Sequence, residues 1–145
     1  MMHGWWYTGD MHREYWNGLY GMNPMKMDEL IRFGRSWAYT PVLSIKGNNF
    51  KSAGYDKSER CYKMENTAGK VNPVEFTLAG SKESPVINPA IFIKNWNGGT
   101  AKVLVNGKAL KDCRTGINRE LSGTDLVVFL TVNSDTKLVI SVVPE

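Results

Sequence analysis

The chain has 145 residues, of which 42% are hydrophobic and 22% charged, and its formal net charge is +4. This length predicts one domain or at most two small ones. The composition is that of a globular protein and argues against a disordered chain. No apolar run approaches the ~20 residues needed to span a bilayer. No signal-peptide pattern follows Met1, which favours a cytosolic chain or else a mature domain or fragment.

The positive charge lies after residue 40. Residues 1–40 carry four basic and four acidic side chains, whereas residues 41–145 carry 14 basic and 10 acidic ones. The lysines are scattered singly, and a nucleic-acid site usually shows a clustered basic stripe with aromatic residues. We therefore expect no nucleic-acid partner, and an acidic polysaccharide is the better anionic candidate.

A helix is predicted over residues 24–38. Asn23 can cap it, Pro24 suits the first helical position, and apolar residues follow at 3.6-residue spacing. Trp37 lies on this apolar face, so we expect it to belong to the core. Pro41 ends the helix because it disfavours a helical conformation at the preceding residue.

From residue 41 onwards the pattern is that of β-strands. Asn106-Gly107 is a strong hairpin signal, and Asn88-Pro89 predicts a bend inside a long apolar run. The last two strands are expected to pair across residues 133–136. The predicted strands cover residues 42–46, 60–65, 74–78, 86–96, 101–105, 108–110, 126–132 and 137–143.

The expected fold is therefore mostly β. About eight strands with turns every 8–12 residues predict an antiparallel β-sandwich of immunoglobulin or jelly-roll type over residues 41–145. Residues 1–40 form an aromatic-rich lead that contains the helix and a short strand near 5–8. This lead is too small to fold alone, so it packs on the sandwich or is the remnant of a preceding module.

Two cysteines, Cys61 and Cys113, stand 52 residues apart. This spacing fits no zinc or redox motif, and two buried free thiols are the first expectation. A disulfide is the alternative, and it needs an oxidising compartment.

One polar triplet could carry chemistry. Asp10, His12 and Glu14 occupy alternate positions, so an extended backbone would place all three on one face. They could perform acid–base catalysis or hold a divalent metal, although alternate charges are also typical of a solvated strand or loop. We predict no cofactor, and this triplet is the one place where a metal is considered.

A second candidate site is aromatic. Nine of the 16 aromatic residues fall within residues 1–40, and flat rings with a polar edge stack on sugars. The alternative is a small core that ties the lead to the sandwich. Trp96, next to Asn97-Gly98-Gly99, is expected near an exposed loop tip. The candidate ligand-binding residues are Trp5, Trp6, Tyr7, Arg13, Tyr15, Trp16, Tyr20 and Trp96.

Three segments carry a resemblance to known proteins: residues 88–96 (NPAIFIKNW), 105–108 (VNGK) and 121–128 (LSGTDLVV). Over about residues 75–143 the chain resembles the C-terminal β-sandwich region of large secreted proteins that bind or degrade polysaccharides. The resemblance implies a secreted or cell-surface location, an oligo- or polysaccharide partner, and a preceding catalytic module. It carries no catalytic residue.

Three functions follow as hypotheses. The first is a carbohydrate-binding or accessory module that stacks sugars on the N-terminal aromatics. The second is a polysaccharide lyase or glycoside hydrolase, or the active-site fragment of one, that uses Asp10, His12 and Glu14. The third is a structural or protein-interaction module. The absence of a restrictive catalytic motif favours a non-enzymatic function.

Overall fold

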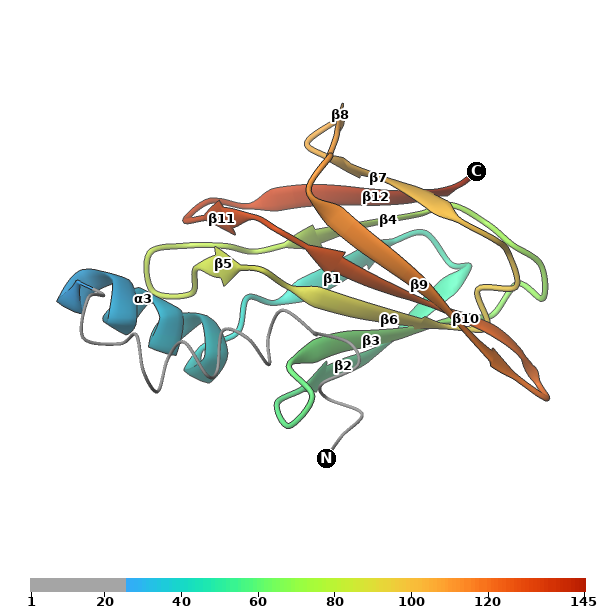
Figure 1. Ribbon diagram of the computed structural model, residues 1–145, viewed down its shortest axis with the longest axis horizontal. Coiled ribbons are helices and arrows are strands. Elements are labelled where there is room, and N and C mark those ends of the chain that lie inside the picture. The colour runs from blue at the N-terminus through green and yellow to red at the C-terminus, as the bar shows by residue number, and fades with distance from the viewer. Residues whose placement is uncertain (1–25) are drawn as a thin grey trace.

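The computed structural model describes residues 26–145, and it shows one helix beside a β-sandwich (Figure 1). The predicted sandwich fold is confirmed. The helix is α3 (Met27–Ala38). The first sheet contains, in spatial order, β1 (Leu43–Lys46), β4 (Val74–Leu78), β12 (Leu138–Pro144), β7 (Ala101–Val105) and β8 (Lys108–Ala109). The second contains β2 (Phe50–Asp56), β3 (Cys61–Asn66), β6 (Ala90–Lys94), β10 (Gly123–Leu130) and β9 (Cys113–Glu120).

A short two-stranded sheet completes the described fold and consists of β5 (Val86–Ile87) and β11 (Asn133–Ser134). The bend predicted at Asn88-Pro89 separates β5 from β6. The described strand pairs are antiparallel with one exception, because β3 pairs with β6 in parallel, with Tyr62 opposite Ile91.

The core lies between the two large sheets. Along β4, β12 and β10, alternate side chains point inward, as period-2 strands require. The largest fully buried side chains include Trp96, Phe76, Met64 and Leu78. A second, smaller apolar cluster lies on the outer face of the second sheet and contains Cys61, Ala90, Val127 and Phe129, with Phe92 packed against it.

The hairpin at Asn106-Gly107 is confirmed. It joins β7 to β8 with Val105 opposite Lys108, and both turn residues have positive φ (51° and 83°). Such angles define the tight turn that matches strand twist, and Asn-Gly tolerates them best.

The predicted pairing of residues 126–132 with 137–143 is wrong. β10 lies in the second sheet and β12 in the first, so the two strands face one another across the core. Segment 133–134 instead adds to β5 and carries the chain from one sheet to the other. Alternation of buried residues is the same for two strands of one hairpin and for two strands in facing sheets, so the sequence pattern did not distinguish these arrangements.

Both cysteines are free thiols. Cys61 begins β3 and belongs to the outer cluster, whereas Cys113 begins β9 and packs against the main core. β6 and β10 separate these strands in the sheet. At about 4.8 Å per strand, this separation exceeds the reach of a disulfide.

Candidate functional site

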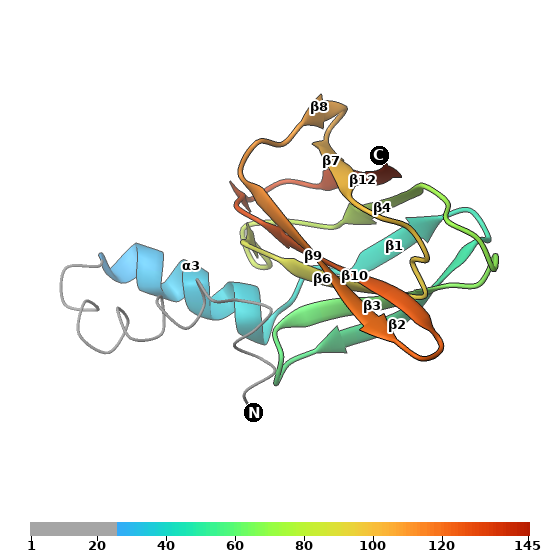
Figure 2. The ribbon, with the colours of Figure 1, turned by 45° about the vertical axis from the view of Figure 1, so that its right-hand side comes forward.

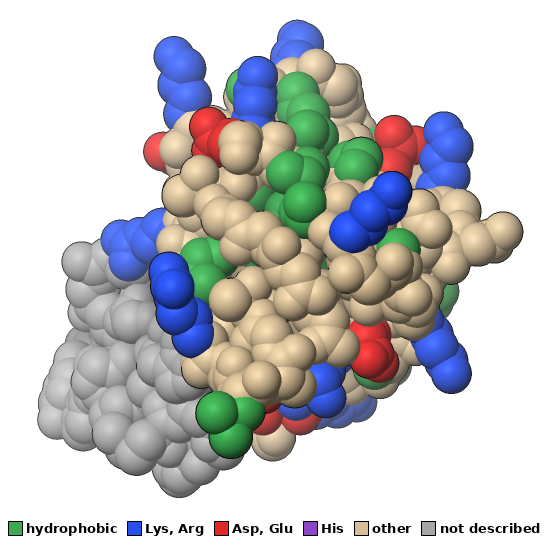
Figure 3. Space-filling model, turned by 90° about the vertical axis from the view of Figure 1, so that its right-hand side faces the viewer, with side chains coloured by type: hydrophobic (Ala, Val, Ile, Leu, Met, Phe, Trp, Pro, Cys, Tyr) green, Lys and Arg blue, Asp and Glu red, His purple; other side chains and the backbone are tan. Residues whose placement is uncertain are grey.

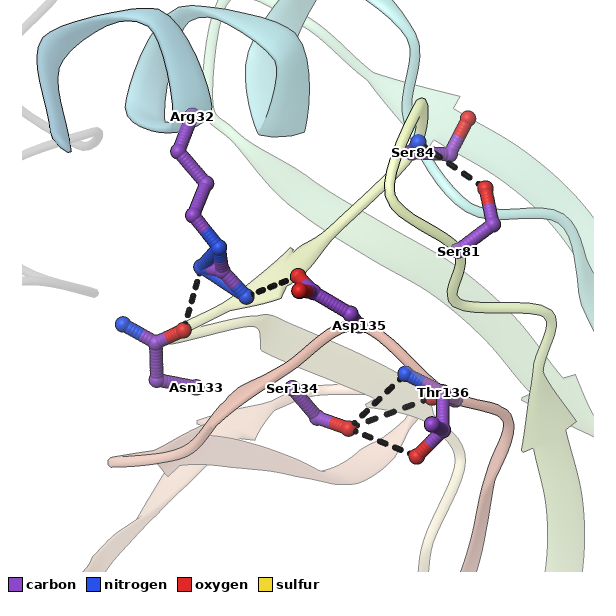
Figure 4. Close-up of polar contacts among 7 residues, drawn as sticks. All are labelled: Arg32, Ser81, Ser84, Asn133, Ser134, Asp135 and Thr136. Atoms are coloured by element: carbon purple, nitrogen blue, oxygen red, sulfur yellow. Dashed lines mark hydrogen bonds and ion pairs between the residues drawn. The ribbon is translucent and has the colours of Figure 1, made fainter. Parts of the chain in front are cut away.

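Helix α3 docks on the sandwich through polar side chains. Arg32 forms an ion pair with Asp135 and donates a hydrogen bond to the Asn133 side-chain oxygen (Figure 4). Ser36 is buried, and its hydroxyl donates to the Phe33 carbonyl at 2.6 Å. The helix therefore rests on the β10–β12 connection by one narrow face, and it projects beside the sheets (Figure 2).

Arg60 provides the second anchor of the helix. Its guanidinium carbon lies 4.9 Å from the ring centre of Phe33 and 5.3 Å from that of Trp37, both within range of a cation–π interaction. The guanidinium also hydrogen-bonds the Tyr55 hydroxyl. Arg60 has φ = 54°, a conformation that costs a non-glycine residue free energy, so this turn is held by its surroundings.

The turn that carries Arg60 is fixed by Asp56. One carboxylate oxygen accepts hydrogen bonds from the Ser58 amide (2.9 Å), the Ser58 hydroxyl (2.7 Å) and the Glu59 amide (3.2 Å). The other lies 3.3 Å from Nζ of Lys63. The Ser58 hydrogen bond, with smaller contributions from Glu59 and Lys63, lowers the pKa of Asp56 to about 2.

Trp37 is not a core residue, and the prediction that placed it there is wrong. Its side chain is 45% exposed, and its indole Nε1–H donates to the Lys57 carbonyl at 3.3 Å. Together with Gly34, Ala38 and Lys57 it lines an open groove of about 240 Å³. A Cβ atom added at Gly34 would meet nothing within 4 Å, so open space lies above this glycine.

Trp96, in contrast to Trp37, was expected to be exposed and is buried. The expectation of an exposed ring near a loop tip is wrong, because Trp96 is 0% exposed and its indole N–H donates to the Gly99 carbonyl at 3.1 Å. Asn95 and Asn97 both have φ = 57°. These two left-handed residues flank the tryptophan in the segment that turns its ring into the core, where it cannot contact a ligand.

The other predicted site residues lie outside the described residues. They are Trp5, Trp6, Tyr7, Asp10, His12, Arg13, Glu14, Tyr15, Trp16 and Tyr20. The catalytic and metal hypotheses for Asp10, His12 and Glu14 therefore stay predictions. Within residues 26–145, no group of three or more His, Cys, Asp or Glu side chains is placed to hold a metal ion.

A polar cluster on the second sheet holds neighbouring strands together. Asp125 is buried and accepts hydrogen bonds from the Asn95 amide (2.9 Å) and the Asn118 side chain (3.4 Å). The Asn95 side chain donates in turn to Glu65 at 3.1 Å. These bonds tie β3, β6, β9 and β10 together at one end of the sheet.

A small cavity under the helix has no room for a substrate. It measures about 20 Å³ and is bordered by Thr40, Tyr55, Tyr62 and Pro89, among others, which is space for about one water molecule. The Tyr62 hydroxyl donates to the Pro41 carbonyl, and burial raises the pKa of Tyr62. This tyrosine is thus a neutral structural donor.

The groove at Trp37 is the described site best suited to a small ligand, and the sequence analysis missed it. The available signal was the pair of small residues, Gly34 and Ala38, that flank Trp37 on one helix face. Along the described chain, no helix is long and apolar enough to cross a membrane. Comparisons with protein-family models, curated proteins and solved structures each found no significant match to this chain.

Proposed function

We propose that the chain is a non-catalytic accessory module of a polysaccharide-utilisation protein and binds an acidic sugar in the groove at Trp37. The observation that carries this proposal is a half-exposed indole whose position is fixed. Arg60 lies over the ring, and the Lys57 carbonyl accepts the indole N–H. A tryptophan held in this way stacks on a sugar without a large loss of side-chain entropy.

The dimensions of the groove support a single sugar ring. Its volume of about 240 Å³ lies just below the ~300–1,000 Å³ that is usual for drug-sized ligands. Gly34 and Ala38 leave the groove floor free of large side chains. The groove would therefore take one unit of a longer polymer.

The charge near the groove supports an anionic sugar. Lys57 lines the groove and is exposed, so its ammonium group can approach a uronate carboxylate or a sulfate. The net charge of +4 adds a weak long-range attraction. Away from the groove, on the face opposite helix α3, lysine and arginine side chains also project singly and form no stripe (Figure 3), unlike the clustered charge of a typical nucleic-acid site.

Titration calorimetry against a panel of acidic and neutral polysaccharides tests the proposal. Trp37→Ala should weaken binding by at least about tenfold, the loss expected for a central tryptophan contact. Tyr39→Ala is the matched control, because Tyr39 is an exposed aromatic at the helix end outside the groove. Lys57→Met should remove the preference for acidic over neutral sugars and its salt dependence.

Two results would refute this function. One is a folded wild-type chain that binds no member of the panel. The other is a genuine affinity that Trp37→Ala and Lys57→Met leave unchanged, since the sugar would then bind elsewhere. Trp37→Phe keeps a stacking ring and should retain part of the affinity, which separates a lost contact from an undocked helix.

A further inference from the structure

Helix α3 turns its apolar face away from the sandwich. Arg32, Phe33 and Ser36 face the domain, whereas Met27 and Ile31 are 70% and 51% exposed. An amphipathic helix normally buries its apolar stripe on its own domain. Among residues 26–145, no segment of the sandwich buries this apolar stripe.

The exposed stripe has the spacing of a helix-pairing seam. Met27, Ile31, Gly34 and Ala38 follow one another at intervals of four, three and four residues. This is the a/d repeat that places side chains along one line facing a second helix. We call these four residues the α3 seam.

The seam is complementary to itself in one orientation. If two copies of α3 cross in an antiparallel direction, Met27 of one copy faces Ala38 of the other, and Ile31 faces Gly34. Each large side chain then meets a small one, as close packing requires. A parallel pair would instead place Gly34 against Gly34 and leave a gap.

The residues on either side of the α3 seam also complement one another in an antiparallel pair. Asp28 and Arg35 border one side of the seam, and Leu30 and Trp37 border the other. In the antiparallel pair, Asp28 of one helix lies beside Arg35 of the second, and Leu30 lies beside Trp37. A two-fold axis generates each contact twice, as in an isologous interface.

From this complementarity we propose that the α3 seam is a self-association surface and that its occupant is a second copy of this chain in antiparallel orientation. A 12-residue helix is about 18 Å long. The paired surface is therefore smaller than the roughly 1,200–2,000 Å² of stable complexes, and the dimer is weak and concentration-dependent. The proposal goes beyond sugar binding and does not require it.

Sedimentation velocity of the full chain over a concentration series tests the surface. The wild type should shift towards a dimer as concentration rises, and Ile31→Asp should abolish the shift. Val42→Asp is the matched control, because Val42 is also an exposed aliphatic residue, 68% against 51% for Ile31, but lies outside the helix. Circular dichroism shows whether each variant folds.

Charge reversal and cross-linking test the orientation. Asp28→Arg or Arg35→Asp alone should weaken the dimer, and the double variant should restore it. Mixed Met27→Cys and Ala38→Cys chains should form a disulfide between copies on oxidation, whereas Met27→Cys alone should not.

Several outcomes would overturn the proposal: a chain that stays monomeric at every concentration, a dimer that Ile31→Asp leaves intact, or a double charge variant no better than the singles. A monomer that Ile31→Asp still destabilises would show that another segment of the chain covers the seam. Gly34 and Ala38 line the groove at Trp37 and also belong to the seam, so a second copy and a sugar would compete for this part of the helix. The two proposals are separated by their variants: Lys57→Met should weaken sugar binding and leave the dimer intact, whereas Ile31→Asp should abolish the dimer and leave the groove residues in place.

Discussion

Replacing Arg60 with lysine should release helix α3 from the sandwich while leaving the core folded. Lysine keeps the charge but lacks the planar guanidinium that lies over Phe33 and Trp37 at 4.9 and 5.3 Å. Each partly buried cation–π contact is worth about 0.5–2 kcal/mol. Because the lysine ammonium retains part of this attraction, the loss for the two contacts together should be about 1–3 kcal/mol, confined to the docking of the helix.

Hydrogen exchange measures this local loss directly. The α3 amides should exchange about 5- to 150-fold faster in Arg60→Lys, the factor that corresponds to 1–3 kcal/mol, while the β4 and β12 amides keep their protection. Arg35→Lys is the control, because Arg35 lies 6.0 Å from the Tyr39 ring on the exposed side of the helix. Equal α3 exchange in the wild type and both variants would show that the stacking does not hold the helix.

Further predictions concern stability, measured by urea unfolding. Trp96→Ala should cost about 3–5 kcal/mol, the usual loss for a buried aromatic ring. Gly34→Ala should stabilise the helix by up to about 1 kcal/mol, because its Cβ enters open space. The same change at Gly80 should destabilise the protein, because its Cβ would collide with the Thr136 carbonyl oxygen. The depressed pKa of Asp56 contributes stability that is present above its unfolded pKa of about 3.9, and it is lost as pH falls through about 2. Asp56→Asn should therefore lower stability near neutral pH and flatten its pH dependence between about 4 and 2.

Much of the sandwich could be predicted from the sequence because apolar and polar residues alternate along its inner strands. The buried and half-buried positions of β4 and β12 give the period-2 pattern, and Asn106-Gly107 fixed one hairpin. The strands β2 and β9 were missed because they lie at the two edges of the second sheet. Their side chains are mostly exposed, so they need no apolar alternation.

For the two described tryptophans, the sequence pattern did not predict which way the side chain points. The apolar stripe of the helix was identified correctly, yet periodicity states only that a face is apolar and does not say which surface covers it. Trp37 was therefore assigned to the wrong side. At Trp96 the neighbouring Asn and Gly residues did mark a turn, but the direction of the ring depends on positive φ angles at Asn95 and Asn97, which composition does not specify.

The helix start was also misplaced. The structure begins α3 at Met27 with Lys26 at the cap position and no side-chain capping bond, whereas the sequence predicted a start at Pro24 with Asn23 as the cap. Asn23 and Pro24 lie outside the described residues. The end before Pro41 agrees with the prediction because proline restricts the backbone of the residue before it.

The parallel pairing of β3 with β6 has a consequence for how this chain reaches its native state. Between these two strands the chain runs through β4, which belongs to the other sheet. The segment that joins β3 to β6 therefore contains a strand of the first sheet, and the two strands pair only when this long segment has brought them together. Such non-local pairing slows folding, and it links the closing of the second sheet to the path of the chain through the first.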